Sequence, residues 1–363
     1  MTQNSSPAYM PPRPAADAPL HIVVPLRPGA DLDQLRAKLD AVPHLQQRAV
    51  RWHVPRARAD IVQLSLEAAR SAKADGGLVV AAGGDGTINA VATAAWAEGV
   101  PMGVLPMGTF NYFARDQSLS LEPQQAVQDV LTALEGGDMR PVGVGFVNQR
   151  MFLVNASVGL YPRLLDNRER ASRRFGRTRL VAILSSIWSV LRGSASRRWR
   201  VSVQPEAGAP LQQQEHLVST LFVGNNRLQL EQVGIDEARD VAGGDRLAVV
   251  LLRPPEGDAS TARMVGNAIL GKLGQDESVT SLACTEMVAE PASWKPQRVK
   301  VAFDGEREWM PPPIRFRVGE RPLWLVAPTA TARDDDAVPE TAAAAAAAGP
   351  APAPVPPAGL APA

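Results

Sequence analysis

Residues 78–96 read LVVAAGGDGTINAVATAAW, and this stretch decides the fold that we expect. Its first five residues, 78–82, form an unbroken apolar run, which is typical of a β-strand whose sheet is covered on both faces. After the glycines, apolar residues recur with the spacing of one helical face: Ile88, Val91, Ala92, Ala95 and Trp96. The stretch therefore predicts a buried strand, a glycine-rich turn and a helix, the unit of a parallel α/β sheet.

The same alternation continues on both sides of this unit. Strand-like runs and helical periodicities follow one another at 22–24, 32–39, 50–54, 61–68, 100–105 and 126–134. Strands that alternate with helices indicate a parallel sheet with helices on both faces. We therefore expect a doubly wound, Rossmann-like α/β domain over residues 20–140.

After about residue 141 the pattern changes to short strands separated by turn signals. Candidate strands lie at 151–154, 201–203, 217–223, 247–252, 279–283 and 299–303, and helical interruptions lie near 179–191 and 261–273. We expect a β-sandwich domain over residues 141–328. A cleft between two such domains is where a site is to be sought first.

The two ends of the chain differ from this core. Residues 1–19 carry several prolines and lack the apolar centre of a secretory signal, so they read as a disordered leader. Residues 329–363 run through an alanine tract into Pro-Ala repeats, which predicts a disordered tail. We expect neither end to carry chemistry.

Composition excludes several classes of function. The 363 residues carry a formal net charge of +1, so there is no global electrostatic case for binding nucleic acid. One cysteine allows no internal disulfide, and the four histidines show no metal-ligand spacing. No apolar stretch approaches the roughly 20 residues of a membrane-spanning helix. A reducing, cytoplasmic setting fits best.

The glycine-rich turn predicts a phosphate site. Gly83, Gly84 and Gly86 let the backbone approach a phosphate, and the helix that begins near Thr87 supplies N–H donors and a positive dipole end. A carboxylate repels phosphate, so Asp85 fits there as a metal ligand or as the base for an attacking hydroxyl. The alternative is a tight turn in which Asp85 or Thr87 caps the helix.

A second loop follows the next predicted strand, at residues 105–116, LPMGTFNYFARD. In a parallel sheet it emerges at the same edge as the first loop. Gly108 and Thr109 would complete a phosphate cradle, and Asn111 would bond to a sugar or a phosphate. The alternative is an ordinary Pro-Gly turn with Phe113 in the core.

Together these loops resemble a known family. GGDGT followed about twenty residues later by P-x-G-T-x-N-x-F-A-R resembles the diacylglycerol kinase catalytic domain, whose superfamily includes bacterial soluble lipid kinases, sphingosine kinases and, more distantly, NAD kinases. Three later segments of the family's pattern follow in the same order: 155–160, NASVGL; 223–226, VGNN; and 303–306, FDGE. The resemblance spans about residues 20–328.

The resemblance implies a fold and a reaction. It implies an α/β nucleotide-binding domain, then a β-sandwich for the lipid, with ATP and Mg²⁺ in the cleft between them. Asp85 would lie at the reacting centre, and Glu306 would be a candidate general base. From the residues alone, Asp304-Gly305 also fits an ordinary hairpin turn.

Three positions depart from the family's usual pattern. Val24 stands where the family usually has Asn, Ala90 where it usually has Glu, and Tyr112 where it usually has Asp. These departures keep open a catalytically impaired nucleotide- or lipid-binding relative. A kinase for a soluble substrate such as NAD is a further alternative.

Residues 163–200 are rich in arginine beside an apolar helical pattern at 180–191. A basic rim next to a helix with Leu, Ile and Trp suits an anionic membrane surface. The residues that we expect at the lipid or membrane are Arg173, Arg174, Arg177, Leu184 and Trp188. The alternative is a solvated basic face with an ordinary core helix.

The sequence thus predicts an ATP-dependent lipid kinase, a phosphotransferase with an alcohol acceptor such as diacylglycerol. We expect a cytoplasmic protein that associates peripherally with an anionic membrane and binds no nucleic acid. The sequence leaves open which lipid accepts the phosphate and whether the chain forms a homodimer.

Overall fold

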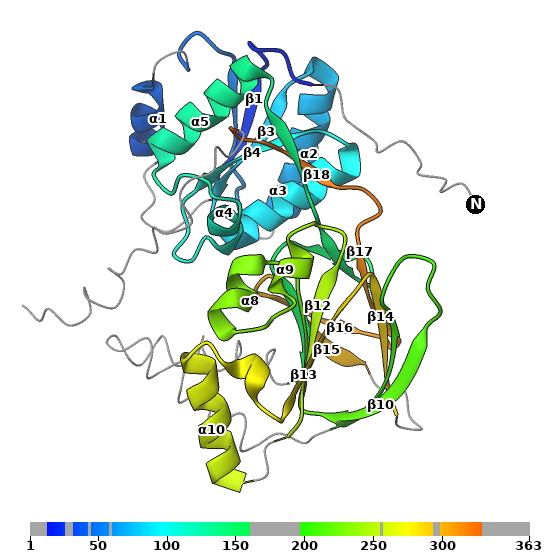
Figure 1. The fold of residues 1–363 in the computed structure, drawn as a ribbon. Helices are drawn as coiled ribbons and strands as arrows, with labels where there is room; N and C mark the ends of the chain where they lie inside the picture. The colour runs from blue at the N-terminus through cyan, green and yellow to red at the C-terminus, as the bar shows by residue number, and fades with distance from the viewer. Residues whose placement is uncertain are drawn as a thin grey trace, which may run out of the picture. The chain divides into compact units, whose positions relative to one another are not determined.

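The structure is a computed structural model that describes residues 13–25, 32–42, 45–57, 60–159, 197–254, 257–292 and 298–328. Within these ranges the strands form three six-stranded sheets (Figure 1). The predicted mixed α/β class is confirmed. In the described part of the chain, no helix is long and apolar enough to span a membrane.

The first sheet is built mostly from the first half of the chain. Its strands lie in the order β2-β1-β3-β4-β18-β5, and all neighbours are parallel except β18 and β5. Their bounds are β1 Leu20–Val23, β2 Val50–His53, β3 Leu78–Gly83, β4 Met102–Pro106, β5 Met139–Val142 and β18 Leu323–Val326. Every residue of β3 is buried, as expected for a central strand.

Helices cover both faces of this sheet (Figure 1). The helices α1 (Leu32–Asp40) and α5 (Pro123–Gly136) pack on one face, where Leu35, Leu39 and Leu131 join the core. The helices α2 (Ile61–Asp75) and α3 (Asp85–Glu98) pack on the other face. A short helix, α4 (Tyr112–Asp116), follows the loop after β4.

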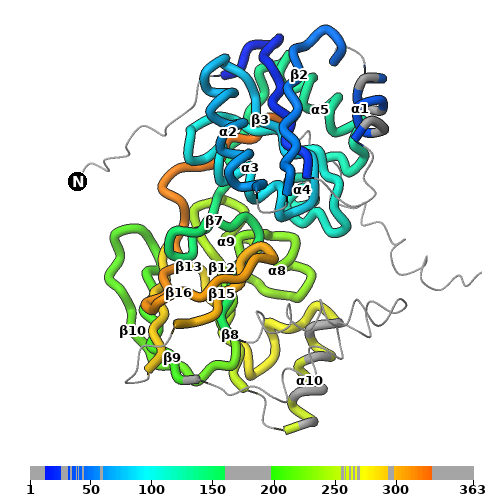
Figure 2. The backbone as a smooth tube through the Cα atoms, turned by 180° about the vertical axis from the view of Figure 1, so that it is seen from behind, coloured from blue at the N-terminus to red at the C-terminus, as the bar shows by residue number. Residues whose placement is uncertain are grey.

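The other two sheets are antiparallel. One has the order β10-β9-β14-β17-β6-β7, with β6 Gly145–Val147, β7 Arg150–Phe152, β9 Arg197–Gln204, β10 Gln212–Val218, β14 Glu286–Pro291 and β17 Ile314–Val318. The other has the order β13-β12-β11-β8-β15-β16, with β8 Asn155–Gly159, β11 Thr220–Gly224, β12 Leu247–Leu252, β13 Val279–Cys284, β15 Val299–Phe303 and β16 Glu306–Met310. Figure 2 shows the β15–β16 hairpin in orange.

These two sheets share one hydrophobic core. Phe152 and Phe316 from one sheet and Leu221 from the other are fully buried in it. Along β8, Ala156 and Val158 enter this core, and Ser157 between them belongs to the opposite face of the strand. That face of the sheet packs against α8 (Arg227–Val233) and α9 (Ala238–Val241). The remaining helical segments are α10 (Gly257–Ile269) and the 3₁₀ helix Leu273–Gln275.

The structure differs from the expected elements in several places, two of which concern the strands β10, β11 and β18. The expected strand at 217–223 is two strands, β10 and β11, interrupted at Ser219, whose N–H and Oγ–H both donate to the Leu252 carbonyl. The late strand β18 pairs with β4 and β5 in the first sheet, whereas the expected boundaries put residues 141–328 in one β domain. The helix expected near 179–191 lies outside the described residues.

Candidate active site

The two predicted loops emerge side by side from one edge of the first sheet. The strands β3 and β4 are parallel, and their last residues, Gly83 and Pro106, pair directly. Beyond this pair the Met107 N–H donates to the Gly83 carbonyl at 2.8 Å. The two loops are therefore joined backbone to backbone where ligands bind in open parallel sheets.

Glycine is required where these loops meet. A Cβ on Gly108 would lie 2.7 Å from the Gly84 Cα atom and 2.6 Å from Asn111 Oδ1. A Cβ on Gly83 would lie 2.7 Å from the Thr87 side chain, which is buried. The glycines thus allow a close contact between the chain segments, whereas a Cβ on the exposed Gly86 would meet open space.

The helix α3 begins directly at this contact. Its N-cap is Gly84, whose extended backbone turns the chain from β3 into the helix, and no side chain caps it. The N-cap residue is therefore Gly84 and not Asp85 or Thr87, and the choice between a phosphate site and a tight turn stays a prediction. The first N–H groups of a helix have no intrahelical acceptor, so this end offers donors and a positive dipole end to an anion.

Asn111 shapes the second loop. Its backbone is left-handed, with φ 52° and ψ 45°, which Asn adopts more readily than most residues. Its Oδ1 accepts the Gly108 N–H at 2.9 Å, and its Nδ2 donates to the Gly108 carbonyl at 3.1 Å. The side chain therefore holds the turn around Gly108. A contact of Asn111 or of the exposed Thr109 with a nucleotide stays a prediction.

Asp85 lies half-buried between the two loops. It is the first residue of α3, and the Phe113 N–H donates to its Oδ1 at 3.4 Å. Burial raises the pKa of this carboxyl above its usual value, and the Phe113 N–H opposes that rise. A carboxylate with a raised pKa at a helix N-terminus is suited to accept a proton or to hold a cation.

The segment FDGE forms a tight hairpin between β15 and β16. Asp304 and Gly305 are its two loop residues, both with positive φ, 41° and 86°, as a type I′ turn requires. Glu306, the predicted base, is exposed and is the first residue of β16. The hairpin-turn interpretation is thus confirmed, and the catalytic role of Glu306 stays a prediction.

Sequence reasoning missed the role of Asp304. Its carboxylate accepts three consecutive backbone N–H groups, from Leu153 at 2.6 Å, Val154 at 2.9 Å and Asn155 at 3.0 Å. A fourth donor is Nδ2 of Asn89 in α3, at 2.8 Å. Burial raises the pKa of Asp304 to about 6, and these donors, which favour the ionised form, oppose the rise.

A second carboxylate also links the α/β part of the chain to the antiparallel part. Here the acceptor, Asp116, belongs to the α/β part, whereas Asp304 belongs to the antiparallel part. Asp116, the last residue of α4, accepts the Leu228 N–H at 3.0 Å at the start of α8. The N-cap of α8 is Asn226, which also donates from Nδ2 to the Tyr112 carbonyl at 3.1 Å. The VGNN segment is therefore bonded to the second glycine loop, a contact that its spacing could not reveal.

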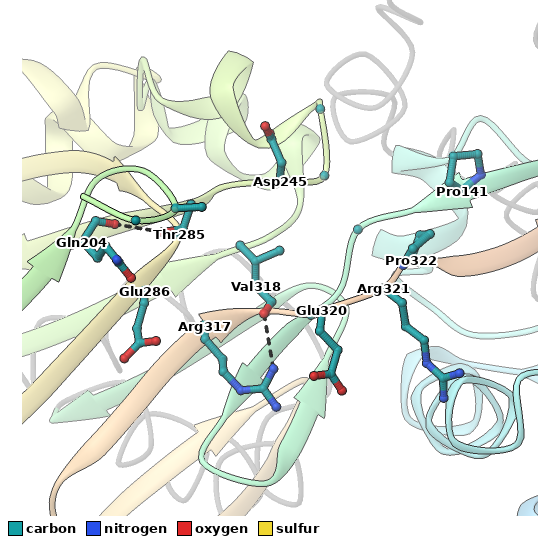
Figure 3. A pocket seen from close by; sticks show the side chains of 16 residues that line it. Pro141, Gln204, Asp245, Thr285, Glu286, Arg317, Val318, Glu320, Arg321 and Pro322 are labelled. Atoms are coloured by element: carbon teal, nitrogen blue, oxygen red, sulfur yellow. Dashed lines mark hydrogen bonds between the residues drawn. The ribbon is translucent and has the colours of Figure 1, made fainter. Parts of the chain in front are cut away.

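A further cavity has a volume of about 580 Å³. Figure 3 shows side chains that line it. Its walls include Gly143, Gly244, Thr285 and Arg317, and none of its lining residues belongs to residues 83–87, 105–116 or 303–306. The Arg317 guanidinium lies over the Phe146 ring, 4.5 Å from its centre. This cavity is not the predicted phosphate site.

Two further expectations concern groups that hold a metal or a lipid. Among the described residues, no three or more His, Cys, Asp or Glu side chains lie close enough together to hold a metal ion. The lipid contacts expected at Arg173, Arg174, Arg177, Leu184 and Trp188 lie outside the described residues.

We predict that Gly108→Ala destabilises the protein by about 1–3 kcal/mol, because the new methyl group forces the two loops apart. Urea denaturation followed by circular dichroism measures this change. Gly266→Ala in α10 is the matched control, since a Cβ there meets nothing within 4 Å and alanine favours the helix by about 0.5–1 kcal/mol. Equal stability of wild type and Gly108→Ala would show that the contact is loose.

We also predict a pH dependence from Asp304. Because its pKa in the folded chain is about 6, above the ordinary value of 3.8 for an aspartate, the folded state binds this proton more tightly than the unfolded state. Its contribution to stability therefore falls as the pH rises from about 4 to 6, by at most ~1.4 kcal/mol per pH unit, and is constant above. The difference in unfolding free energy between wild type and Asp304→Asn, measured from pH 4 to 7, isolates the contribution of the Asp304 carboxyl to stability. A difference that grows with pH would mean that the N–H donors outweigh burial.

Comparison with known proteins supports the family resemblance. Residues 29–147 match the family model of the diacylglycerol kinase catalytic domain. A Klebsiella pneumoniae protein named probable lipid kinase YegS-like is 40% identical over 83 residues, 22% of this chain and 27% of that protein. A Staphylococcus saprophyticus diacylglycerol kinase is 36% identical over 97 residues, 26% of this chain and 30% of that protein. The chain therefore matches less than a third of the length of either relative.

The fold extends the similarity beyond these segments. A crystal structure of a diacylglycerol kinase from Bacillus anthracis superimposes with a TM-score of 0.58 and 17% identity, covering 86% of this chain and 97% of that one. At that identity the match shows a shared fold. The resemblance seen in the motifs is confirmed, since residues 29–147 match the model of the diacylglycerol kinase catalytic domain and the similar proteins are named lipid kinase and diacylglycerol kinase.

Proposed function

We propose that the protein is an ATP-dependent lipid kinase that transfers the γ-phosphoryl group of ATP to a lipid hydroxyl. The observation that carries this proposal is the backbone contact between the loops after β3 and β4, with Asp85 between them at the start of α3. The N–H groups of Met107, Gly108 and Thr87 already donate within the protein, so the donors to phosphates would come from the first residues of α3. Asp85 adds a carboxylate, which repels phosphate but suits a metal ion or a reacting hydroxyl.

The phosphates of ATP would lie against the N-terminus of α3 and the turn at Gly108. The exposed Gly86, where a Cβ would meet open space, leaves the backbone of the first loop accessible to phosphate oxygens, whereas Gly84 is buried against Gly108. Asn111 would act indirectly, because its two bonds to Gly108 keep the second loop in shape. We place the lipid in a cleft that borders this edge of the sheet.

The residues present fit a Mg²⁺ ion that is shared with ATP. Mg²⁺ is usually held by one or two carboxylates together with substrate phosphates and water. Asp85 offers one such carboxylate beside the proposed phosphate-binding position. Among the described residues it does not belong to a group of three or more metal-ligating side chains. When bound, Mg²⁺ would neutralise charge on the phosphoryl oxygens.

In the proposed reaction a lipid hydroxyl oxygen attacks the γ-phosphorus of ATP. The new bond joins that oxygen to phosphorus, the bond between the γ-phosphorus and the β,γ-bridging oxygen breaks, and ADP leaves with its electron pair. The hydroxyl proton passes to Glu306 or to Asp85. The raised pKa of Asp85 favours proton acceptance by that residue, and the exposure of Glu306 favours access to an incoming substrate.

A lipid kinase must take its substrate from the surface of a bilayer. We propose that the basic and apolar residues Arg173, Arg174, Arg177, Leu184 and Trp188 meet that surface, on the basis of their sequence pattern alone. Sedimentation with anionic and with neutral vesicles tests this part of the proposal. Equal retention on both kinds of vesicle would contradict it.

Phosphate transfer from γ-labelled ATP tests the function directly. Purified protein is incubated with labelled ATP, Mg²⁺ and either a total lipid extract or NAD, and the labelled product is identified. The proposal predicts label in a lipid fraction. Label in NADP would favour the soluble-substrate alternative, and binding of ATP without any labelled product would favour a non-catalytic relative.

We predict that Asp85→Asn lowers the rate of phosphoryl transfer by at least about 10²-fold, because the amide neither accepts the proton nor balances the metal charge. Turnover with labelled ATP measures this loss, and thermal unfolding checks that the variant is folded. Asp129→Asn is the matched control, since Asp129 lies on α5 at the opposite face of the sheet, where its Oδ1 accepts from Gln125 Nε2 at 2.8 Å. Wild-type turnover in Asp85→Asn would remove Asp85 from the mechanism.

A further inference from the structure

The β15–β16 hairpin, which carries Glu306, is held in place by the side chain of Asp304 in its turn. Asp304 lies two residues before Glu306, and its carboxylate accepts four N–H donors. Glu306 in turn pairs directly with Phe303 across the two-residue turn. Because the turn is this short, holding the Asp304 carboxylate also holds the backbone of Glu306.

Three of the four donors come from one place. The consecutive N–H groups of residues 153–155, between β7 and β8, fix the carboxylate within the antiparallel sheets. The fourth donor, Asn89 Nδ2, comes from α3 in the first part of the chain. The hydrogen bond from Asn89 therefore joins the β15–β16 hairpin to α3.

The side-chain amide of Asn89 donates to two acceptors in the antiparallel part of the chain. Its Nδ2 donates to Asp304 Oδ2 at 2.8 Å and to the Met151 carbonyl at 3.2 Å, so the amide nitrogen bonds to both β7 and the hairpin. Asn89 follows Asp85 by four residues in α3, and residues at this spacing lie on one helix face, one turn apart. The hydrogen bond between Asn89 and Asp304 therefore joins two short segments that each carry a predicted catalytic carboxylate. Asp85 lies on the helix of Asn89, and Glu306 lies on the hairpin of Asp304.

We propose that Asn89 and Asp304 are positioning residues, whose hydrogen bond sets the hairpin bearing Glu306 against the helix that begins with Asp85. This inference rests on the proposed kinase function for its kinetic consequence, but its structural part is independent of that function. Positioning of this kind matters because displacement of a reacting group by about 1 Å costs up to about 10²-fold in rate.

Other contacts between the two regions do not replace this bond. Asp116 and Asn226 join α4 and its preceding loop to α8, and Trp96 donates to the Arg321 carbonyl at 3.0 Å. These contacts hold elements other than the β15–β16 hairpin. Loss of the Asn89 bond alone therefore removes the link between the hairpin and α3, while the hairpin stays bonded to residues 153–155.

The test combines hydrogen exchange of the unliganded protein with steady-state kinetics on the lipid that the wild type phosphorylates. Asn89→Ala removes the donor, and Asn89→Asp replaces it with a like charge of the same shape. Arg150→Ala is the matched control, because the exposed Arg150–Glu308 pair, at 2.7 Å, joins β7 to the same hairpin without reaching α3. Asn89→Gln, which keeps a donor, serves if Asn89→Ala does not fold.

For Asn89→Ala we expect amide exchange in residues 303–307 to be at least about tenfold faster, and kcat to fall by about 10–100-fold with KM for ATP changed less than threefold. Asn89→Asp should show a larger effect, and Arg150→Ala neither effect. Unchanged exchange at 303–307 would overturn the structural link, and faster exchange with unchanged kcat would overturn its role in catalysis. If the wild type phosphorylates nothing, the proposed function fails, and the exchange data still decide whether the bond positions the hairpin.

Discussion

The site depends on one steric constraint, the contact between Gly84 and Gly108 at the ends of two adjacent parallel strands. The Met107 N–H bond to the Gly83 carbonyl brings the loops together, and a methyl group on Gly108 would not fit between them. This constraint makes the glycines of both loops necessary for the fold as well as for any phosphate. It also fixes where Asp85 lies, because α3 starts at the same point.

The second organising feature is a pair of carboxylates, Asp304 and Asp116, that join the α/β part of the chain to the antiparallel part. Asp304 accepts from α3, and Asp116 accepts from the start of α8. Burial raises the pKa of both carboxyls. Each is supported by backbone N–H donors, so neither stands as an unpaired buried charge, which would be costly. The segments that resemble the family's motifs are therefore held together by side chains that the motifs themselves contain or adjoin.

The first sheet could be predicted from the sequence because its strands are buried on both faces and its helices are strongly periodic. The β3–turn–α3 unit and the edge shared by the two loops follow from residues 78–116. The strand β18 could not be predicted in that sheet, because four apolar residues carry no signal of which sheet they join. The break at Ser219 within an apolar run depends on bonds to Leu252, 33 residues away.

The candidate site was predicted in part. Asp-Gly at 304–305 correctly indicates a hairpin turn, yet the same pattern does not show that the aspartate side chain turns inward to four donors. Asn89 lies 215 residues from Asp304, so only the tertiary structure reveals their bond. Asn111, expected at the nucleotide, has both polar ends bonded to Gly108, a local turn geometry that a list of polar residues does not distinguish from ligand binding.

We expect the two glycine loops and the Asp304–Glu306 hairpin to form one nucleotide-dependent site. Hydrogen exchange with and without Mg²⁺-ATP tests this most directly, because it reads all three segments in one experiment. The account predicts slower amide exchange at residues 84–88, 107–111 and 303–306 when Mg²⁺-ATP is bound. Unchanged exchange in all three segments at saturating nucleotide, or protection elsewhere in the described chain alone, would contradict it.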